Sequence, residues 1–558
     1  MPANLPHDVW LNIAGHLPIL GLRTLYSVNA ALFHIALDAR YRQISLIYWD
    51  DRLLRTLIRL RDPFIARRVK ILHIYPGFLK EVMDKDAISR GKDSHRPSSS
   101  FRVRLADIAQ QFDKVFAPSK AHGDRQGAPQ NLYDLPPRQA TDKLRERLKT
   151  PQDVMTAVLD FLRGLPSLTD YYVTWYGLPT ADDNALSLTS LAVPCIGTPL
   201  LSPTLTKLSL DISLENIHAL CTADFHVARL EHLHLHLHSD HQLSPESLCH
   251  ILHDRLANSV SNLAPYLRSL SIEAHEPMDI GPLFNGLVTL TKLDTLALAL
   301  PLQKPHLGNP KALARFLRRQ AETIRVLRLR ATQHDAGSTG AASGAHWRRI
   351  GTPDPWSLNS WIRTAFGSDA GEEYQEWYYE QEEDGTHDYP LGEYDMDALE
   401  SLEVSSNLLP LETAIYCAER FGSKVKTLGL LGSVKSFEFV KELVKVLGRN
   451  VDGCEEVDGD GEDVVWQWLT PSPVTPSSKA PPSSSVNTNL RTLRIGPVPL
   501  SPELLDLLAN NLRSLQHLEL IVKHFLPSQD DVPIYGPSRT RGDGDGIQLD
   551  EQVVCVPP

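Results

Sequence analysis

The chain has 558 residues, of which 42% are hydrophobic and 22% are charged, and this ordinary globular composition excludes a wholly disordered protein. Twelve acidic residues and no Lys or Arg lie between positions 369 and 397, and they account for the formal net charge of −12, since the other 56 acids equal the 56 bases. Without a basic region we expect no nucleic-acid partner, and without an uninterrupted apolar run of ~18 residues we expect no membrane span.

The cysteines indicate a reducing compartment. The six Cys residues stand at positions 195, 221, 249, 417, 454 and 555, and no two of them form a C-x-x-C pair. Neither a disulfide framework nor a zinc site is expected from such scattered positions. We therefore expect a soluble intracellular protein, cytoplasmic, nuclear or both.

Residues 1–45 carry the pattern of three short helices. Pro18 separates the first helix from the second, and Asn29 is placed to cap the third. The apolar positions that recur at helical spacing are Val9, Ile13, Leu17, Leu22, Leu25, Leu32, Ile35, Ala36 and Ala39. Three such helices bury little apolar area alone, so they must dock on the rest of the chain or on another protein.

The order of these residues resembles the F-box motif. The residues that carry the resemblance are Leu5-Pro6, Val9-Trp10, Ile13, Leu17-Pro18, Leu22, Leu25, Val28 and Leu32-Phe33. In that family the motif is a small helical module that binds a Skp-type adaptor and so joins a cullin–RING ubiquitin ligase. The resemblance implies that the adaptor-binding residues, shared with the core of the module, are Leu5, Pro6, Val9, Ile13, Leu17, Leu22 and Leu25.

A second pattern, apolar-x-x-Leu-x-apolar, recurs along the rest of the chain. Its nine central leucines are Leu208, Leu233, Leu270, Leu296, Leu327, Leu402, Leu428, Leu493 and Leu518. Four of the eight intervals between them are 25 or 26 residues, within the ~20–29 typical of leucine-rich repeats. Each copy predicts a short strand with inward leucines and a return segment. Weaker copies lie at Val69-Leu72-Ile74 and Leu165-Leu168.

The intervening segments predict helices that cover the strands. We expect them near residues 245–256, 310–317, 411–421, 437–447 and 502–508, where apolar residues follow Pro or polar starts at helical spacing. Strand and helix alternating at this period favour stacked units, because no unit buries its apolar face alone.

The expected fold class is α/β: a short three-helix F-box-like module followed by an irregular leucine-rich-repeat solenoid, or horseshoe, with long disordered insertions. The expected parts are the module (1–45), a linker with the first repeat-like strands (46–91), a charged excursion with one or two exposed helices (92–150), repeats (151–330), an acidic and aromatic insertion (331–397), repeats (398–449), an acidic then Ser/Pro-rich disordered loop (450–488), C-terminal repeats (489–527) and a disordered tail (528–558).

Polar residues that alternate with the inward leucines are expected to form a target-binding concave face. They are Lys207, Ser209, Asp211, His232, His234, His236, Ser271, Glu273, Arg328, Arg330, Glu403, Arg494 and Glu519. Their mixed chemistry indicates a protein or peptide target.

Four histidines, His232, His234, His236 and His238, alternate with leucines and predict one exposed row on a strand, with His241 beyond. Imidazoles spaced in this way could bind Zn²⁺ or another transition metal. No Cys or acidic partner stands at a ligand spacing along the chain, so we favour a polar face and expect no metal site. The row could make partner binding sensitive to pH between ~5 and 7.

The acidic insertion allows two interpretations. Trp377, Tyr378 and Tyr379 lie within it and could anchor a basic partner. The same composition is equally typical of a solvated insertion that only keeps the protein soluble.

No motif for nucleotide binding, metalloprotease or serine-hydrolase chemistry occurs in the chain. We therefore expect neither catalysis nor a cofactor, and an enzyme within residues 331–397 is disfavoured for the same reason.

The whole chain resembles the F-box leucine-rich-repeat proteins, most closely fungal-type F-box domain-containing proteins. That resemblance implies the substrate-recognition subunit of a cullin–RING (SCF-type) ubiquitin ligase, which binds a Skp-type adaptor and, through its repeats, an unknown protein target. The rival hypothesis is a non-catalytic leucine-rich-repeat scaffold or signalling adaptor outside any ligase. In that case the helices would be a cap packed against Ile44, Leu46 and Ile47.

Overall fold

The computed structural model describes residues 5–25, 27–75, 137–148, 150–174, 204–215, 217, 229–238, 244–274, 278–301, 310–332, 355–367, 394–433, 437–452, 489–525 and 552–556. The chain divides into two compact units, which are described separately. Unit 1 comprises residues 1–276 and 280–293, and unit 2 comprises residues 277–279 and 294–558. Among the described residues, no helix is both long and apolar enough to cross a membrane.

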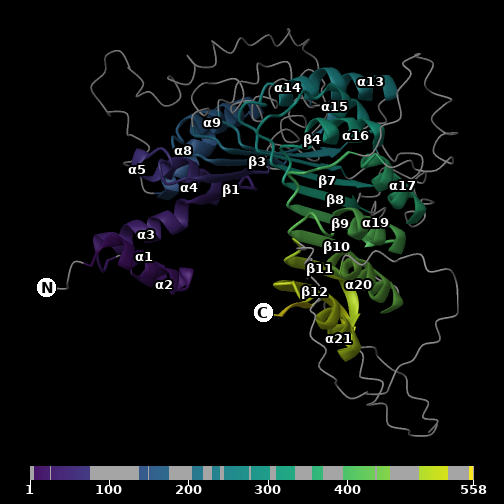
Figure 1. Cartoon of the computed structure of the whole chain (residues 1–558). Helices are drawn as coiled ribbons and strands as arrows, with labels where there is room; N and C mark the ends of the chain where they lie inside the picture. The colour runs from purple at the N-terminus through teal and green to yellow at the C-terminus, as the bar shows by residue number, and fades with distance from the viewer. Residues whose placement is uncertain are drawn as a thin grey trace, which may run out of the picture. The chain divides into compact units, whose positions relative to one another are not determined.

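Unit 1 begins with helices and continues as strands, with described helices between several of them (Figure 1). Its strands are β1 (Gln43–Leu46), β2 (Ile71–Ile74), β3 (Asp170–Thr174), β4 (Lys207–Ser213), β5 (His232–His238) and β6 (Ser269–Ala274). Its helices are α1 (His7–Gly15), α2 (Ile19–Thr24), α3 (Ala30–Tyr41), α4 (Asp51–Arg59), α5 (Pro63–Ala66), α8 (Pro137–Arg147), α9 (Pro151–Arg163), α13 (Pro245–Cys249), the π-helical turn η1 (His250–Leu256), α14 (Ala257–Ser261) and α15 (Gly281–Gly286).

Unit 2 alternates regularly, and its helices all lie along one side of its parallel strands (Figure 1). Its strands are β7 (Thr295–Pro301), β8 (Val326–Thr332), β9 (Ser401–Leu408), β10 (Thr427–Ser433), β11 (Thr492–Leu500), β12 (His517–Phe525) and β13 (Gln552–Val556). Its helices are α16 (Pro310–Arg319), α17 (Pro355–Ala365), α19 (Leu411–Phe421), α20 (Phe437–Asp452) and α21 (Pro502–Asn511).

The strands β1–β6 and β7–β12 are parallel within their units and neighbour one another in chain order. A single backbone motif repeats along both sheets: the carbonyl just before a strand accepts two N–H bonds from the start of the next repeat. Thr206 O accepts from Glu231 N and His232 N, both at 2.9 Å, and Lys426 O accepts in the same way from Arg491 N and Thr492 N. The expected α/β class is confirmed, with twelve parallel strands among the described residues.

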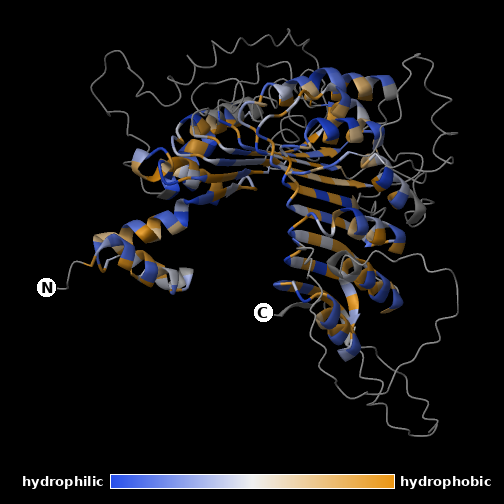
Figure 2. Cartoon of the chain, in the orientation of Figure 1, coloured by the Kyte–Doolittle hydropathy of each residue, from blue (hydrophilic) through white to orange (hydrophobic). Residues whose placement is uncertain are grey.

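The leucine pattern sets this architecture because its inward positions are buried. Leu208, Leu233 and Leu270 lie in register on β4, β5 and β6, and each is at most 2% exposed. Figure 2 shows the corresponding alternation of hydrophobic and hydrophilic residues along the strands. Only the last copy of the leucine pattern departs from this burial, because its Leu515 and Leu518 are half-buried. All nine predicted strands are present, and helices occupy each of the five segments in which they were expected.

The N-terminal helices form where the sequence predicted them. Asn29 caps α3, and its Oδ1 accepts a hydrogen bond from Leu32 N at 2.7 Å. The core of these helices is Ala14, Leu22, Ile35 and Ala36, with Trp10 and Leu17 packed against it. Ala39, expected on the same face, is exposed instead.

Several elements differ from the expectation. The strand β1 had not been predicted, and α8, expected to be an exposed helix, buries Ala140 and Leu144. The predicted disordered tail contains β13, which pairs antiparallel with β12. The valine-rich stretch 552–556 suits a strand, and the edge of β12 offers unpaired backbone groups to it. The acidic stretch 368–393 and the Ser/Pro-rich loop 453–488 lie outside the described residues.

Candidate functional site: protein-binding surfaces

Helix α1 and Leu5, just before it, present an exposed apolar stripe. Leu5, Val9 and Ile13 recur every four residues, and their exposed fractions are 41%, 40% and 39%. Pro6, between the first two, is also exposed. An apolar row at helical spacing with no covering element in the described chain has the chemistry of a surface that docks on another protein.

The other residues predicted to bind the adaptor lie deeper. Leu22 is buried in the core of the helices, and Leu17 and Leu25 are half-buried. The seven residues thus divide into an exposed set, Leu5, Pro6, Val9 and Ile13, and a structural set that supports it.

Helix α3 connects these helices firmly to the first strands of unit 1. The buried guanidinium of Arg68 forms an ion pair with Asp38 and donates to His34 O at 3.2 Å. The same guanidinium lies 4.5 Å from the ring centroid of Phe64. The helices that carry the apolar stripe are therefore joined to the first strands of unit 1 by specific side-chain contacts. Of the residues expected beneath a cap, Ile44 and Leu46 are buried, while Ile47 is 39% exposed.

A second candidate surface is the polar face of β4, β5 and β6 in unit 1. The parallel register places Asp211, His236 and Glu273 side by side, and Ser209, His234 and Ser271 form the adjacent row. Lys207 and His232 begin a third row. The structure therefore brings all the predicted target-binding residues of unit 1 onto one face.

The histidine row is less uniform than expected, because exposure falls along β5. His232 is exposed and His234 and His236 are partly buried, but His238 is 2% exposed and belongs to the interior. Acidic partners do lie nearby: Asp211 Oδ1 is 3.5 Å from His236 Nδ1 and 3.3 Å from His238 Nδ1. The sequence did not reveal them because they come from neighbouring strands. Aligning the repeats would have found them.

These contacts shift the ionisation of the cluster. Burial alone would raise the pKa of Asp211, but hydrogen bonds from His236 and His238 hold this pKa well below its usual range. Burial alone would lower the pKa of His236, but the hydrogen bond to Asp211 and the charges of Asp211 and Glu273 raise it above the usual value. Asp211 and His236 therefore form an ion pair over a range of mildly acidic pH.

An aromatic cluster extends this face towards β2. The rings of His73 and Tyr172 stack with centroids 4.2 Å apart, and Lys207 Nζ lies 5.4 Å from the Tyr172 ring centroid. Sequence reasoning did not select His73 or Tyr172. His73 and Tyr172 occupy the same position on their strands as Ser209 does on β4, and an alignment of the strands could have identified them.

In unit 2 the predicted polar residues form an ion-pair network. Arg494 on β11 binds Glu519 on β12 through Nε and Nη2, at 2.8 and 3.2 Å, and Glu403 on β9 through Nη1, at 2.7 Å. Hydrogen bonding to Glu519 is the main cause that raises the pKa of Arg494. Because Arg494 donates hydrogen bonds to both Glu403 and Glu519 and balances their charge, the main role of these three residues is structural.

Arg328 and Arg330 on β8 differ from that network. Both side chains are exposed, and neither forms an ion pair with any carboxylate in the described part of the chain. They are consequently the best candidates in unit 2 for contacts with a target.

Within the described ranges, no group of three or more His, Cys, Asp or Glu residues is arranged to hold a metal ion. No protein-family model matches this chain, and no curated protein is detectably similar to it.

Proposed function

We propose that this protein is the substrate-recognition subunit of a cullin–RING (SCF-type) ubiquitin ligase. The N-terminal helices bind a Skp-type adaptor, and the polar strand faces bind a protein target. The chain itself performs no chemistry; it raises the effective concentration of target lysines near the ubiquitin-loaded enzyme.

The observation that carries the proposal is the exposure of the apolar stripe. In a cap, Leu5, Val9 and Ile13 would be covered by the rest of the chain, whereas in the described structure all three are exposed, as is Leu11 of α1. The F-box resemblance assigns three of these four residues to the adaptor. Burial of a three-residue stripe supplies ~2–4 kcal/mol of transfer free energy, enough to contribute substantially to a specific interface.

The proposal is tested by co-expression with the host's Skp-type adaptor followed by size-exclusion chromatography. We expect the wild type to co-elute with the adaptor, Leu5→Ala/Pro6→Ala to weaken co-elution, and Val9→Asp/Ile13→Asp to abolish it. These residues are exposed, so the variants should retain the wild-type circular dichroism spectrum.

A matched control places two aspartates at exposed apolar positions elsewhere. Val288 and Leu505 are 48% and 39% exposed, and Val288→Asp/Leu505→Asp should co-elute like the wild type. If the folded wild type elutes alone, the ligase proposal fails, and the non-catalytic repeat scaffold takes its place. Equal loss of co-elution in both aspartate variants would also contradict binding through the stripe.

A further inference from the structure

A basic pocket lies in unit 1, between α3, β1 and α4. Its volume is about 560 Å³, within the range of ligand-binding cavities. Four arginines line it: Arg40 from α3, and Arg52, Arg55 and Arg59 from α4. No acidic residue is among its lining residues. This basic cluster stands out because acids and bases are equal in number outside residues 369–397.

The sequence of α4 places its arginines on one face. Arg52, Arg55 and Arg59 are spaced three and four residues apart, and Leu53, Leu54 and Leu57, between them in the sequence, are buried. The helix begins at a firm cap, since Asp50 Oδ1 accepts from Leu53 N at 2.8 Å. The arginine face is thus fixed by the burial of the opposite face.

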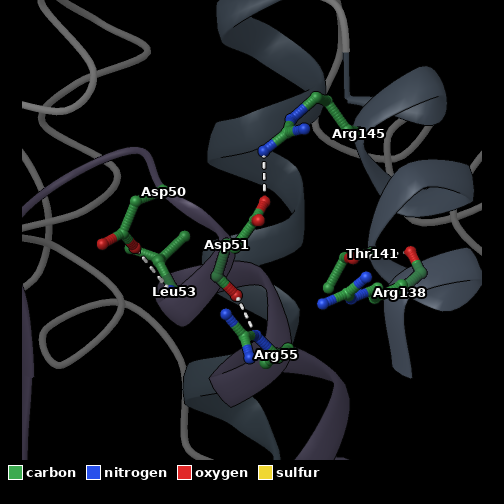
Figure 3. Close-up of polar contacts among 7 residues, drawn as sticks. All are labelled: Asp50, Asp51, Leu53, Arg55, Arg138, Thr141 and Arg145. Atoms are coloured by element: carbon green, nitrogen blue, oxygen red, sulfur yellow. Dashed lines mark hydrogen bonds and ion pairs between the residues drawn. The ribbon is translucent and has the colours of Figure 1, made fainter.

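Polar contacts around the first turn of α4 anchor it further (Figure 3). The carboxylate of Asp51 forms an ion pair with Arg145 of α8, and Asp51 O accepts from Arg55 Nε at 3.0 Å. Asp51 is the one acidic residue of α4, and its carboxylate is already paired with Arg145. Arg40, Arg52, Arg55 and Arg59 form no ion pair with a described carboxylate.

Four guanidinium groups around one cavity repel one another, and an anion that bridges them relieves this repulsion. Guanidinium forks match phosphate oxygens in bidentate geometry, and a tetrahedral phosphate can accept from several directions at once. A single phosphomonoester carries only ~2 negative charges, fewer than the arginines can balance. The hydroxyl of Ser45, which also lines the pocket, is a suitable additional donor.

We propose that this pocket binds a compact soluble anion with two or more phosphate groups. The inference is independent of the adaptor-binding proposal, because the pocket residues are separate from the apolar stripe on α1.

Isothermal titration calorimetry of the full chain with tripolyphosphate tests this site. Tripolyphosphate should bind at least tenfold more tightly than inorganic phosphate, and its affinity should fall as salt rises from ~50 to ~200 mM, because salt screens these exposed charges. Arg52→Ala/Arg59→Ala should weaken binding at least tenfold. Arg52→Lys/Arg59→Lys keeps the charge but loses the bidentate guanidinium groups, and it should bind tripolyphosphate with intermediate affinity.

The control Arg67→Ala/Arg138→Ala removes the same charge from exposed arginines outside the pocket lining and should change affinity less than twofold. Equal weakening in the two alanine variants, or no binding of tripolyphosphate by the folded wild type, would overturn the proposal. If a doubly phosphorylated peptide binds the protein and tripolyphosphate does not, the proposal is also overturned, in favour of a protein ligand. Titration with ATP in the absence of Mg²⁺ distinguishes two sources of the phosphates. Tighter binding of ATP than of tripolyphosphate would identify the ligand as a nucleotide, and weaker binding would identify it as an anion without a base. Adaptor co-elution should be unchanged in all these variants.

Discussion

Arg494 on β11 donates a hydrogen bond to Glu403 on β9 at 2.7 Å, across the intervening strand β10. The contact is possible because Gly429 occupies the register position between them. A Cβ atom at Gly429 would lie 3.1 Å from Glu403 Cγ, closer than an ordinary van der Waals contact. The absence of a side chain on one strand therefore allows an ion pair between its two neighbours.

Gly429→Val should destabilise unit 2, because the added methyl groups occupy the space that the Arg494 side chain crosses. We expect a loss of ~1 kcal/mol in the free energy of unfolding, measured by urea denaturation. Gly15→Ala is the control, since a Cβ there meets nothing within 4 Å. A valine that leaves the urea midpoint unchanged would contradict this account of Gly429.

Arg494→Met should cost more than the loss of one surface ion pair. The variant leaves two carboxylates, Glu403 and Glu519, without their cation at side-chain exposures of only 23% and 20%. We expect a loss of ~1–2 kcal/mol in urea denaturation, and a smaller loss for Arg494→Lys, which keeps the charge but not the bidentate geometry. Arg513→Met, at an exposed position, should be neutral. Equal stability of the Met and Lys variants would contradict the bidentate contribution.

The Asp211–His236 pair should stabilise unit 1 most in mildly acidic solution. The depressed pKa of Asp211 contributes stability above its unfolded pKa of ~4, and this is lost as pH falls through the folded value. The raised pKa of His236 contributes stability below ~6.5, and this is lost as pH rises through the folded value. Both contributions coexist between about pH 4 and 6.5.

Asp211→Asn should therefore lower the free energy of unfolding by ~1 kcal/mol at about pH 5.5 and by less at about pH 9. Histidine hydrogen–deuterium exchange should also show a lower pKa for His236 in the variant. Asp506→Asn, at an exposed position, serves as the control. An equal loss of stability at both pH values would indicate a role in packing rather than an ion pair.

Target binding in unit 2 is best tested at Arg328 and Arg330. Reversing Glu403 or Glu519 would break the Arg494 network, so a lost target could reflect altered structure. Arg328→Glu/Arg330→Glu changes exposed side chains without described ion-pair partners, and we expect at least a tenfold loss of each co-purifying target by quantitative mass spectrometry.

The control for this reversal is Arg318→Glu/Arg513→Glu, on α16 and after α21, where both side chains are exposed. Recovery of the targets should be unaffected there. If the Arg328/Arg330 variant stays folded and retains every target, the polar face of β8 is not a binding surface.

The repeat pattern predicted most of the strands and helices because their signal is local. A leucine at every second strand position must face the interior, and a helix must cover the apolar side of each repeat. The same reasoning missed β1, whose four residues carry only two buried apolar positions, and β13, which pairs with β12 through its backbone.

The α/β class, the positions of the repeats, the Asn29 cap and the inward leucines were predictable from the sequence, because each depends on residues close together in the chain. Which polar residues meet depends instead on how the chain folds in three dimensions. Folding places Asp211 beside His236 and His238, Arg494 between Glu403 and Glu519, and the arginines of α3 and α4 around one pocket. Residues in direct contact, such as Arg494 and Glu403, are 91 positions apart in the chain. They are brought together by strand register and helix packing, which the local pattern does not specify.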